Sequence, residues 1–246
     1  MIVSRIREQA KDQNWVSVVL DLLIVAVGLY FGLQADAWWQ NLQDSRQERI
    51  YLTELQEDFV LNEEIIDIAL ENGDLIIRDM IALMEQTQLE SPDLPVEQLD
   101  EHLSSLQTMP TVLPISRAYD NLTGSGELSV LRNREIKNGL ADYYSYAKVI
   151  ELVQSTHEMQ LVQTFQPYLS ENTEFGRVLI SWQEDDEYSL PEPPSESGVL
   201  ELINTRDFRN IVTEKYYSAR DLYDLHDGLK EINDELVALL QTALSN

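Results

Sequence analysis

The chain has 246 residues, of which 43% are hydrophobic and 8% aromatic. This composition is typical of one substantial folded domain and not of a disordered protein. There is no cysteine, which excludes disulfide bonds, thiolate metal sites and cysteine nucleophiles. The formal net charge is −27, and residues 36–246 carry 41 of the 44 acidic side chains. We therefore expect no binding to nucleic acid and no flat adsorption on anionic lipid.

The first predicted element is a transmembrane helix over residues 16–39. About 20 consecutive apolar residues are needed to cross a bilayer, and this segment supplies that length. Its strongly polar interruptions are Asp21, Gln34 and Asp36. Trp15 lies at one end and Trp38 and Trp39 at the other, where tryptophan prefers the membrane–water interface. Residues 1–15 are expected to form a cytoplasmic segment. This segment can lie on the lipid headgroups as an amphipathic helix.

Two other interpretations of the apolar segment stay open. The triplet Ala35-Asp36-Ala37 has the small-x-small form of a signal-peptide cleavage site. A buried core helix of a soluble protein would also be apolar. The length and the flanking tryptophans favour the membrane anchor over both.

The orientation follows from a weak charge bias. Arg5, Arg7 and Lys11 precede the segment, and Arg46 and Arg49 follow it. A short basic N-terminus before a first apolar helix favours a cytoplasmic N-terminus. In a two-membrane bacterium the chain would then sit in the inner membrane, with its acidic domain, residues 40–246, in the periplasm.

Two features inside the predicted span suggest functional hypotheses. Gly28 and Gly32, continued by Ala35, form a small face through which two membrane helices can pack closely. Asp21 is an ionisable residue within the span, and such residues usually face a partner or a water-filled path. The non-functional alternative is that the side chain of Asp21 snorkels to the nearby membrane surface or is protonated.

The remaining sequence predicts three long helices, at about 47–87, 133–168 and 205–244, joined by connectors 88–132 and 169–204. Each helix carries an apolar stripe with steps of three and four. The first stripe is Leu52, Leu55, Phe59, Asn62, Ile66, Ala69, Gly73, Ile76, Met80 and Leu83. The second is Ile136, Leu140, Tyr143, Ala147, Ile150, His157, Leu161 and Phe165. The third is Phe208, Ile211, Tyr216, Ala219, Leu222, Leu225, Leu229, Ile232, Leu236 and Leu239.

These stripes predict an all-α fold, in which the transmembrane helix continues into an elongated antiparallel bundle of about three helices with coiled-coil-like packing. Asn62 and Gly73 interrupt the first stripe, which suits a bundle better than an isolated two-stranded coiled coil. In the connectors, residues 96–107 predict a short helix between prolines, and Asn133 is a candidate N-cap for the second long helix.

No catalytic, cofactor or metal site is predicted. His102, His157 and His226 have no histidine three or four residues away, and zinc would need distant carboxylates. The run Glu184–Glu187 lacks the ligand spacing of a calcium loop. The tyrosines at 143, 144 and 146 and at 216 and 217 fall on helix stripes, so we expect the two clusters to pack in the core, where they could meet.

Two sequence blocks together form a recognisable pattern. The first block comprises Gln13-Asn14-Trp15, Asp21, residues 24–34, Trp38, Tyr51-Leu52, Leu55 and Asp58. The second comprises Tyr119, Leu122, Ser125-Gly126, Leu128, Leu140 and Tyr143-Tyr144. Both blocks resemble an uncharacterised family of small bacterial membrane proteins that carry a domain of unknown function, frequent in Alphaproteobacteria and Bacteroidetes. The chain has Asp36-Ala37-Trp38 where family members have Asn-x-Trp. The resemblance implies a single-pass anchor and a bacterial origin, and it implies no chemistry.

The sequence therefore favours a non-enzymatic interaction protein that assembles with itself or with another membrane complex. One alternative is an ion- or proton-coupled subunit that uses Asp21. Another is an extracytoplasmic sensor, which would need a partner because the predicted cytoplasmic tail of 15 residues is too short to hold a signalling domain.

Overall fold

The computed structural model describes residues 15–179, 191, 193 and 195–245, with side chains from residue 22 onward. In these ranges every regular element is a helix and none is a strand, so the predicted all-α class is confirmed. The chain divides into two compact units, Met1–Tyr51 and Leu52–Asn246. The helix α2, Trp15–Gln86, belongs to both units.

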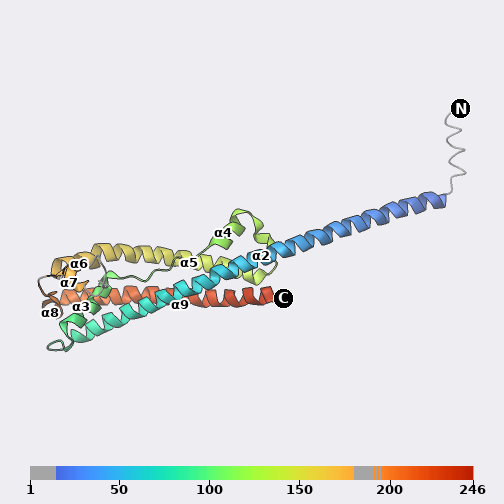
Figure 1. The fold of residues 1–246 in the computed structure, drawn as a ribbon. Coiled ribbons are helices and arrows are strands. Elements are labelled where there is room, and N and C mark those ends of the chain that lie inside the picture. The colour runs from blue at the N-terminus through green and yellow to red at the C-terminus, as the bar shows by residue number, and fades with distance from the viewer. Residues whose placement is uncertain (1–14, 180–190, 192, 194, 246) are drawn as a thin grey trace. The chain divides into compact units, whose positions relative to one another are not determined.

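The N-terminal unit contains the apolar part of α2 (Figure 1). This stretch has no proline, so nothing interrupts the helix. Its large apolar side chains between Leu22 and Leu33 are exposed. Among the described residues, α2 is a helix long and apolar enough to cross a membrane, by length and composition.

The second unit contains the rest of α2 and two further long helical segments. One is α5, Arg134–Gln160, which continues through a π-helical turn, η3 (Leu161–Phe165), into α6, Gln166–Asn172. The other is α9, Arg206–Ser245. The π turn comes directly before Pro167, whose ring cannot fit against the carbonyl of residue 163 in a regular α-helix. The single helix predicted over 133–168 therefore has a widened turn near its end.

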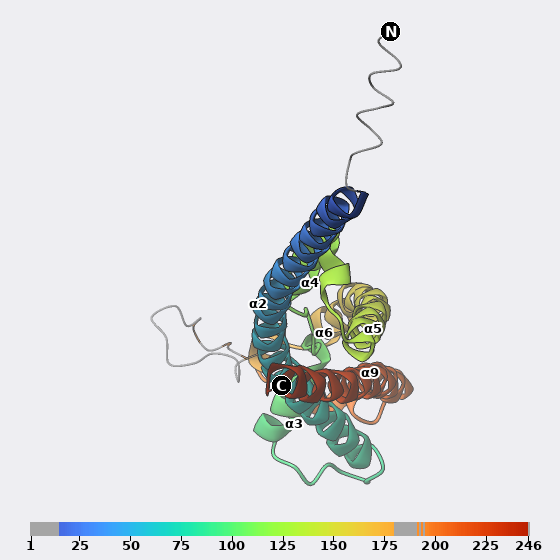
Figure 2. The ribbon, with the colours of Figure 1, turned by 90° about the vertical axis from the view of Figure 1, so that its right-hand side faces the viewer.

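Helices α5 and α9 pack side by side in opposite directions (Figures 1 and 2). A Cβ atom added at Gly139 would lie 2.8 Å from Cδ2 of Leu236, and one at Gly228 would lie 2.6 Å from the hydroxyl of Tyr146. Further along, Ser218 donates to Oε1 of Gln160 at 2.7 Å. As the residue number rises on α5 it falls on α9, which defines an antiparallel register.

Helix α9 also runs antiparallel to the second-unit part of α2. Asn233 donates to the carbonyl of Phe59 at 3.1 Å, and Lys230 lies 2.9 Å from Asp67. A Cβ added at Gly73 would lie 3.3 Å from the ring of Tyr223. Gly73 therefore interrupts the predicted stripe because the tyrosine ring occupies the space of a side chain.

The stripe predicted on α2 is confirmed, since all ten of its residues are buried. The stripe predicted on α9 is wrong in part. The buried seam there follows steps of four and three without a break: Phe208, Val212, Lys215, Ala219, Leu222, His226, Leu229, Asn233, Leu236 and Leu240. The predicted stripe contained apolar neighbours such as Ile211 and Leu225 in place of the polar seam residues. These neighbours are only half-buried.

Short helices occupy the connectors. Helix α3, Val96–Ser104, continues into the 3₁₀ turn η1, Ser105–Gln107, within the range predicted for a short helix. Helix α4, Arg117–Gly124, and the 3₁₀ turn η2, Glu127–Val130, precede α5. Helices α7, Phe175–Val178, and α8, Val199–Leu202, precede α9. The acidic run Glu184–Glu187 lies outside the described residues.

The N-cap of α5 is confirmed: Oδ1 of Asn133 accepts hydrogen bonds from the amides of Glu135 at 2.8 Å and Ile136 at 3.4 Å. We predict that Asn133→Ala lowers the free energy of unfolding by about 1 kcal/mol, because these amides lose their acceptor. Far-UV circular dichroism during chemical denaturation of the detergent-solubilised chain would measure it. Asn138→Ala, an exposed change in the same helix, is the control and should not destabilise the chain. Equal effects from both changes would contradict the capping role.

Candidate functional site

The predicted packing residues of the anchor lie on an uncovered helix surface. Gly28, Gly32 and Ala35 share one face of α2, and a Cβ added at either glycine would meet no atom within 4 Å. Trp38 and Trp39 are 65% and 54% exposed, and their ring centroids lie 6.5 Å apart. This surface is therefore available to a partner helix or to lipid.

For Trp15 and Asp21 the structure describes the backbone. Trp15 is the first residue of α2, and Asp21 lies about 1.7 turns further along. Their side chains lie outside the described residues. The roles assigned to them stay predictions.

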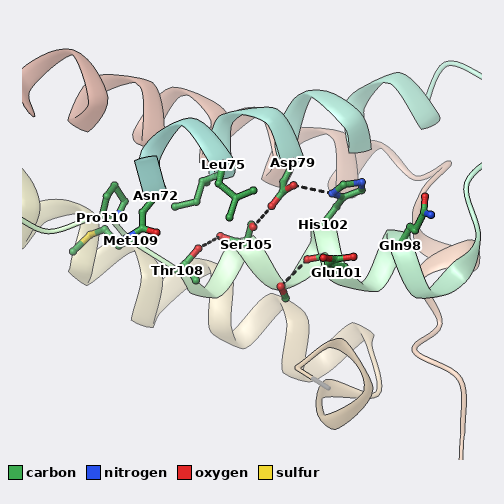
Figure 3. A pocket seen from close by; sticks show the side chains of 12 residues that line it. Asn72, Leu75, Asp79, Gln98, Glu101, His102, Ser105, Thr108, Met109 and Pro110 are labelled. Atoms are coloured by element: carbon green, nitrogen blue, oxygen red, sulfur yellow. Dashed lines mark hydrogen bonds and ion pairs between the residues drawn. The ribbon is translucent and has the colours of Figure 1, made fainter. Parts of the chain in front are cut away.

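A cleft between α2 and the α3–η1 segment is lined by several polar side chains (Figure 3). Its volume is about 720 Å³, enough for a small molecule. In the cleft wall, Nδ1 of His102 lies 2.8 Å from Oδ1 of Asp79. The hydroxyl of Ser105 donates to the other carboxylate oxygen. The carboxylate thus joins α2 to both α3 and η1.

This group has the residue types of a hydrolytic triad but not the order. In a triad the imidazole lies between the nucleophilic hydroxyl and the carboxylate, so that it can remove the hydroxyl proton. Here the carboxylate of Asp79 lies between Ser105 and His102 and accepts from Ser105 directly. The arrangement orients both side chains and cross-links the elements, and it does not activate Ser105 as a nucleophile.

A second set of polar side chains holds an extended segment, residues 108–116, against the long helices. Asn62 of α2 accepts from the Ile115 amide at 2.6 Å and donates to its carbonyl at 3.0 Å. Gln154 of α5 does the same for Val112, at 2.8 and 3.2 Å. A backbone in this setting lacks the internal hydrogen bonds of a helix, so these side-chain clamps supply its partners. The carbonyl of Ile115 also accepts from the hydroxyl of Tyr144 at 3.1 Å.

The carboxylate of Asp58 fastens the end of this segment. Its Oδ2 accepts from the amide of Ala118 at 2.9 Å, and its Oδ1 lies 2.6 Å from the guanidinium of Arg117. Ala118 is in the first turn of α4, so a residue from α2 supplies the negative charge that a helix N-terminus favours. Sequence analysis missed the roles of both Asp58 and Asn62, although the position of the polar Asn62 on the buried stripe of α2 was a visible signal of its clamp.

Lys215 provides a third attachment, from α9. It is 4% exposed, its ammonium donates to the carbonyl of Thr108, and it lies 5.1 Å from the ring centroid of Phe165. Burial lowers the pKa of Lys215 to about 7. Helices α2, α5 and α9 thus each contribute a polar side chain that binds the backbone of residues 108–116.

His226 lies behind the clamp at Val112. Its Nε2 is 3.1 Å from Oε1 of Gln154, and its Nδ1 has no hydrogen-bond partner among the described residues. Burial lowers the pKa of His226 to about 4, so the ring is neutral at pH 7. The same burial raises the pKa of Tyr143, whose ring packs on Phe59 at 4.8 Å between centroids.

The three histidines lie in separate places, and their partners differ. His102 contacts Asp79, His157 contacts Asp221 at 3.2 Å, and His226 contacts Gln154. In the described ranges no three acidic or histidine side chains gather in a way that could hold a metal ion.

The two tyrosine clusters lie at different levels along α9. Tyr143 packs against Phe59 and Tyr144, whereas Tyr216 packs against Tyr217. In the antiparallel register Gly228 faces Tyr146 and Glu214 faces Gln160, so residues 216 and 217 lie near the far end of α5. The two clusters therefore do not meet, and the expectation that both pack in the core is wrong for Tyr217, which is exposed.

Comparison with profiles of known protein families, with curated protein sequences and with solved structures gave no match. The function must therefore be argued from the residues themselves.

The clamp at Ile115 yields a prediction. Asn62→Leu should lower the free energy of unfolding by about 1 to 3 kcal/mol, since the amide of Ile115 loses its acceptor, whereas the carbonyl keeps the hydroxyl of Tyr144 as a donor at 3.1 Å. Hydrogen exchange in a peptide covering residues 109–117 should also accelerate, because the amide of Ile115 loses its acceptor. Asn72→Leu, an exposed change on the same helix, is the control and should alter neither quantity much. An unchanged exchange rate in Asn62→Leu would show that the clamp does not hold the segment.

Lys215 yields a prediction about pH. Its folded pKa is about 7 and its unfolded value about 10.5, so between these values the unfolded chain holds a proton that the folded chain lacks. Stability of the wild type should therefore rise with pH through this window relative to Lys215→Met. From pH 7 to pH 9 we expect the difference to change by about 2 kcal/mol in favour of lysine.

Chemical denaturation of the full chain at both pH values would measure this change. Lys148→Met, which removes one cation from the exposed side of α5, is the matched control and should not follow this course. A difference between wild type and Lys215→Met that stays constant with pH would contradict the buried, destabilised charge.

Proposed function

We propose that the chain is a membrane-anchored helical interaction protein, without catalysis of its own, that assembles with itself or with a larger membrane complex. The observation that carries this proposal is the uncovered apolar surface of α2. Between Leu22 and Leu33 nine large apolar side chains are 43% to 70% exposed. In water each would cost free energy in proportion to its apolar area, whereas lipid removes this cost.

The proposed topology places residues 16–39 across the membrane. The N-terminus would be cytoplasmic and residues 40–246 periplasmic, in the inner membrane of a two-membrane bacterium. The slight basic bias of residues 1–15 supports this orientation. The resemblance to single-pass bacterial proteins agrees with it.

For the second unit we propose an antiparallel bundle built from the later part of α2, α5 and α9. The contacts of Asn233 with Phe59 and of Ser218 with Gln160 support it, because α9 meets both other helices in opposite directions. An interaction role also agrees with the structural roles of the buried polar side chains, which bind the chain's own backbone. Asp58, Asn62 and Gln154 bind backbone groups of the chain itself.

For assembly within the membrane we propose the face of Gly28, Gly32 and Ala35. Helices in lipid associate by close packing, and small residues let two backbones approach. Neither glycine has an atom within 4 Å of its would-be Cβ, so the face is open for this contact.

Carbonate extraction and sizing test the proposal. The wild-type chain should remain in the membrane pellet at alkaline pH. Val25→Lys combined with Leu29→Lys should release it, because each charge costs about 3 kcal/mol at the centre of a bilayer. A wild-type chain that is extracted by carbonate, and is monodisperse without detergent, would refute the anchor.

A second experiment tests the glycine face. Gly28→Ile with Gly32→Ile should shift the detergent-solubilised protein toward monomer in light-scattering measurements. Ala26→Ile with Ala37→Ile adds the same bulk on the opposite side of the helix, at 100° per residue, and should preserve assembly. Asp21→Asn should also preserve it. Assembly that depends on Asp21, or a wild type that is monomeric and co-purifies with no membrane protein, would contradict the proposal.

A further inference from the structure

Two grooves flank the exposed side chain of Tyr217 on α9. The groove between α2 and α9 is lined by Met80, Ile81 and Met84 together with Tyr216. The groove between α5 and α9 is lined by Met159 and by polar residues of both helices. Tyr217 lines both grooves, and 66% of it is exposed. We call the surface formed by Ile81, Met84, Met159 and Tyr217 with their acidic neighbours the Tyr217 face.

The apolar part of the Tyr217 face crosses three helices. Ile81 of α2 is 44% exposed and Met159 of α5 is 56% exposed, with Tyr217 between them on α9. Tyrosine anchors interfaces because it buries a large area with few rotatable bonds, and methionine adapts its shape to a partner. Apolar groups gathered in this way on an otherwise charged protein mark an interaction surface.

The charge of the Tyr217 face has one sign. Glu85 lines the first groove, and Glu214 and Asp221 line the second. Among the described residues that line either groove, none is lysine or arginine. The side-chain amide of Gln160 donates to the carboxylate of Glu214, and His157 lies 3.2 Å from Asp221. Arg220, next along α9, lies outside both linings and binds Asp224 at 2.9 Å.

This charge pattern indicates which kind of molecule binds the Tyr217 face. A second copy of the chain, with a net charge of −27, would bring acidic side chains against Glu85, Glu214 and Asp221 and would be repelled. A cationic partner would be attracted over a distance and held by the same carboxylates at the rim. The grooves are lined by residues of neighbouring helices, and an apolar stripe flanked by basic residues fits their chemistry.

We propose that the Tyr217 face docks a basic amphipathic helix of a partner protein, with the partner's apolar stripe on Ile81, Met159 and Tyr217 and its lysines or arginines near Glu85, Glu214 and Asp221. This inference rests on the proposed interaction function and names the chemistry of the partner. It assigns the contact to the second unit, separate from the glycine face of the anchor.

The test uses the full chain in nanodiscs of phosphatidylcholine. The probe is a labelled 18-residue helix with leucine at positions i, i+3, i+4 and i+7 and lysine elsewhere. Fluorescence anisotropy should give saturable binding, and Tyr217→Ala should raise Kd about tenfold or more. Ile81→Ala, on a different helix, should also weaken binding. Ile68→Ala, which changes an isoleucine of α2 that is 53% exposed and lies outside the grooves, should change Kd less than twofold.

A second peptide, with glutamate in place of every lysine, should not bind. The proposal is overturned if the lysine peptide fails to bind the wild type, if both peptides bind alike, or if Tyr217→Ala and Ile68→Ala bind as the wild type does. The last result would show attraction by net charge alone. Circular dichroism of each variant confirms that it is folded. Carbonate extraction reports on the anchor and not on this face, so failure of either proposal is distinguishable from failure of the other.

Discussion

The second unit depends on one constraint: the backbone of an extended segment must be hydrogen-bonded where no helix or strand can do it. Residues 108–116 have no secondary structure of their own. Asn62 and Gln154 each pair with both backbone groups of one residue, and Lys215 binds the carbonyl of Thr108. Leaving such groups buried and unpaired costs about 1 to 3 kcal/mol each, so these side chains stabilise the segment and fix its position against three helices.

This constraint explains one polar residue of the buried α9 seam directly, since Lys215 binds the segment, whereas His226 contacts the clamp residue Gln154 and Asn233 binds the carbonyl of Phe59 on α2. Lys215, His226 and Asn233 continue a strict four-three repeat on α9 that apolar residues occupy elsewhere. The cost is visible in the lowered pKa values of Lys215 and His226, since burial disfavours their charged forms. A seam of this kind has a single register in which the polar groups meet their partners, whereas a wholly apolar seam tolerates slippage.

The glycine face of the anchor and the Tyr217 face differ in chemistry. We proposed lipid as the surroundings of the first and water as those of the second. The first unit exposes an apolar helix with a small-residue face, which suits lipid and helix packing by close contact. The second unit is acidic, and its apolar groups around Tyr217 are interrupted by carboxylates. Under the proposals made above, one surface sets where the protein resides and the other sets what it recruits.

The sequence by itself determined the helical class, the apolar N-terminal helix, the cap at Asn133 and the buried stripe of α2. These follow from local periodicity and local hydrogen bonding, which depend on neighbours a few residues apart. Only the tertiary structure decided the α9 seam, the grouping of Asp79 with His102 and Ser105, and the attachment of residues 108–116. A polar residue on a helix stripe is buried or exposed according to partners that lie 42 or 53 residues away, as for Gln154 and Asn62. Periodicity carries no information about such partners, because it describes one helix at a time.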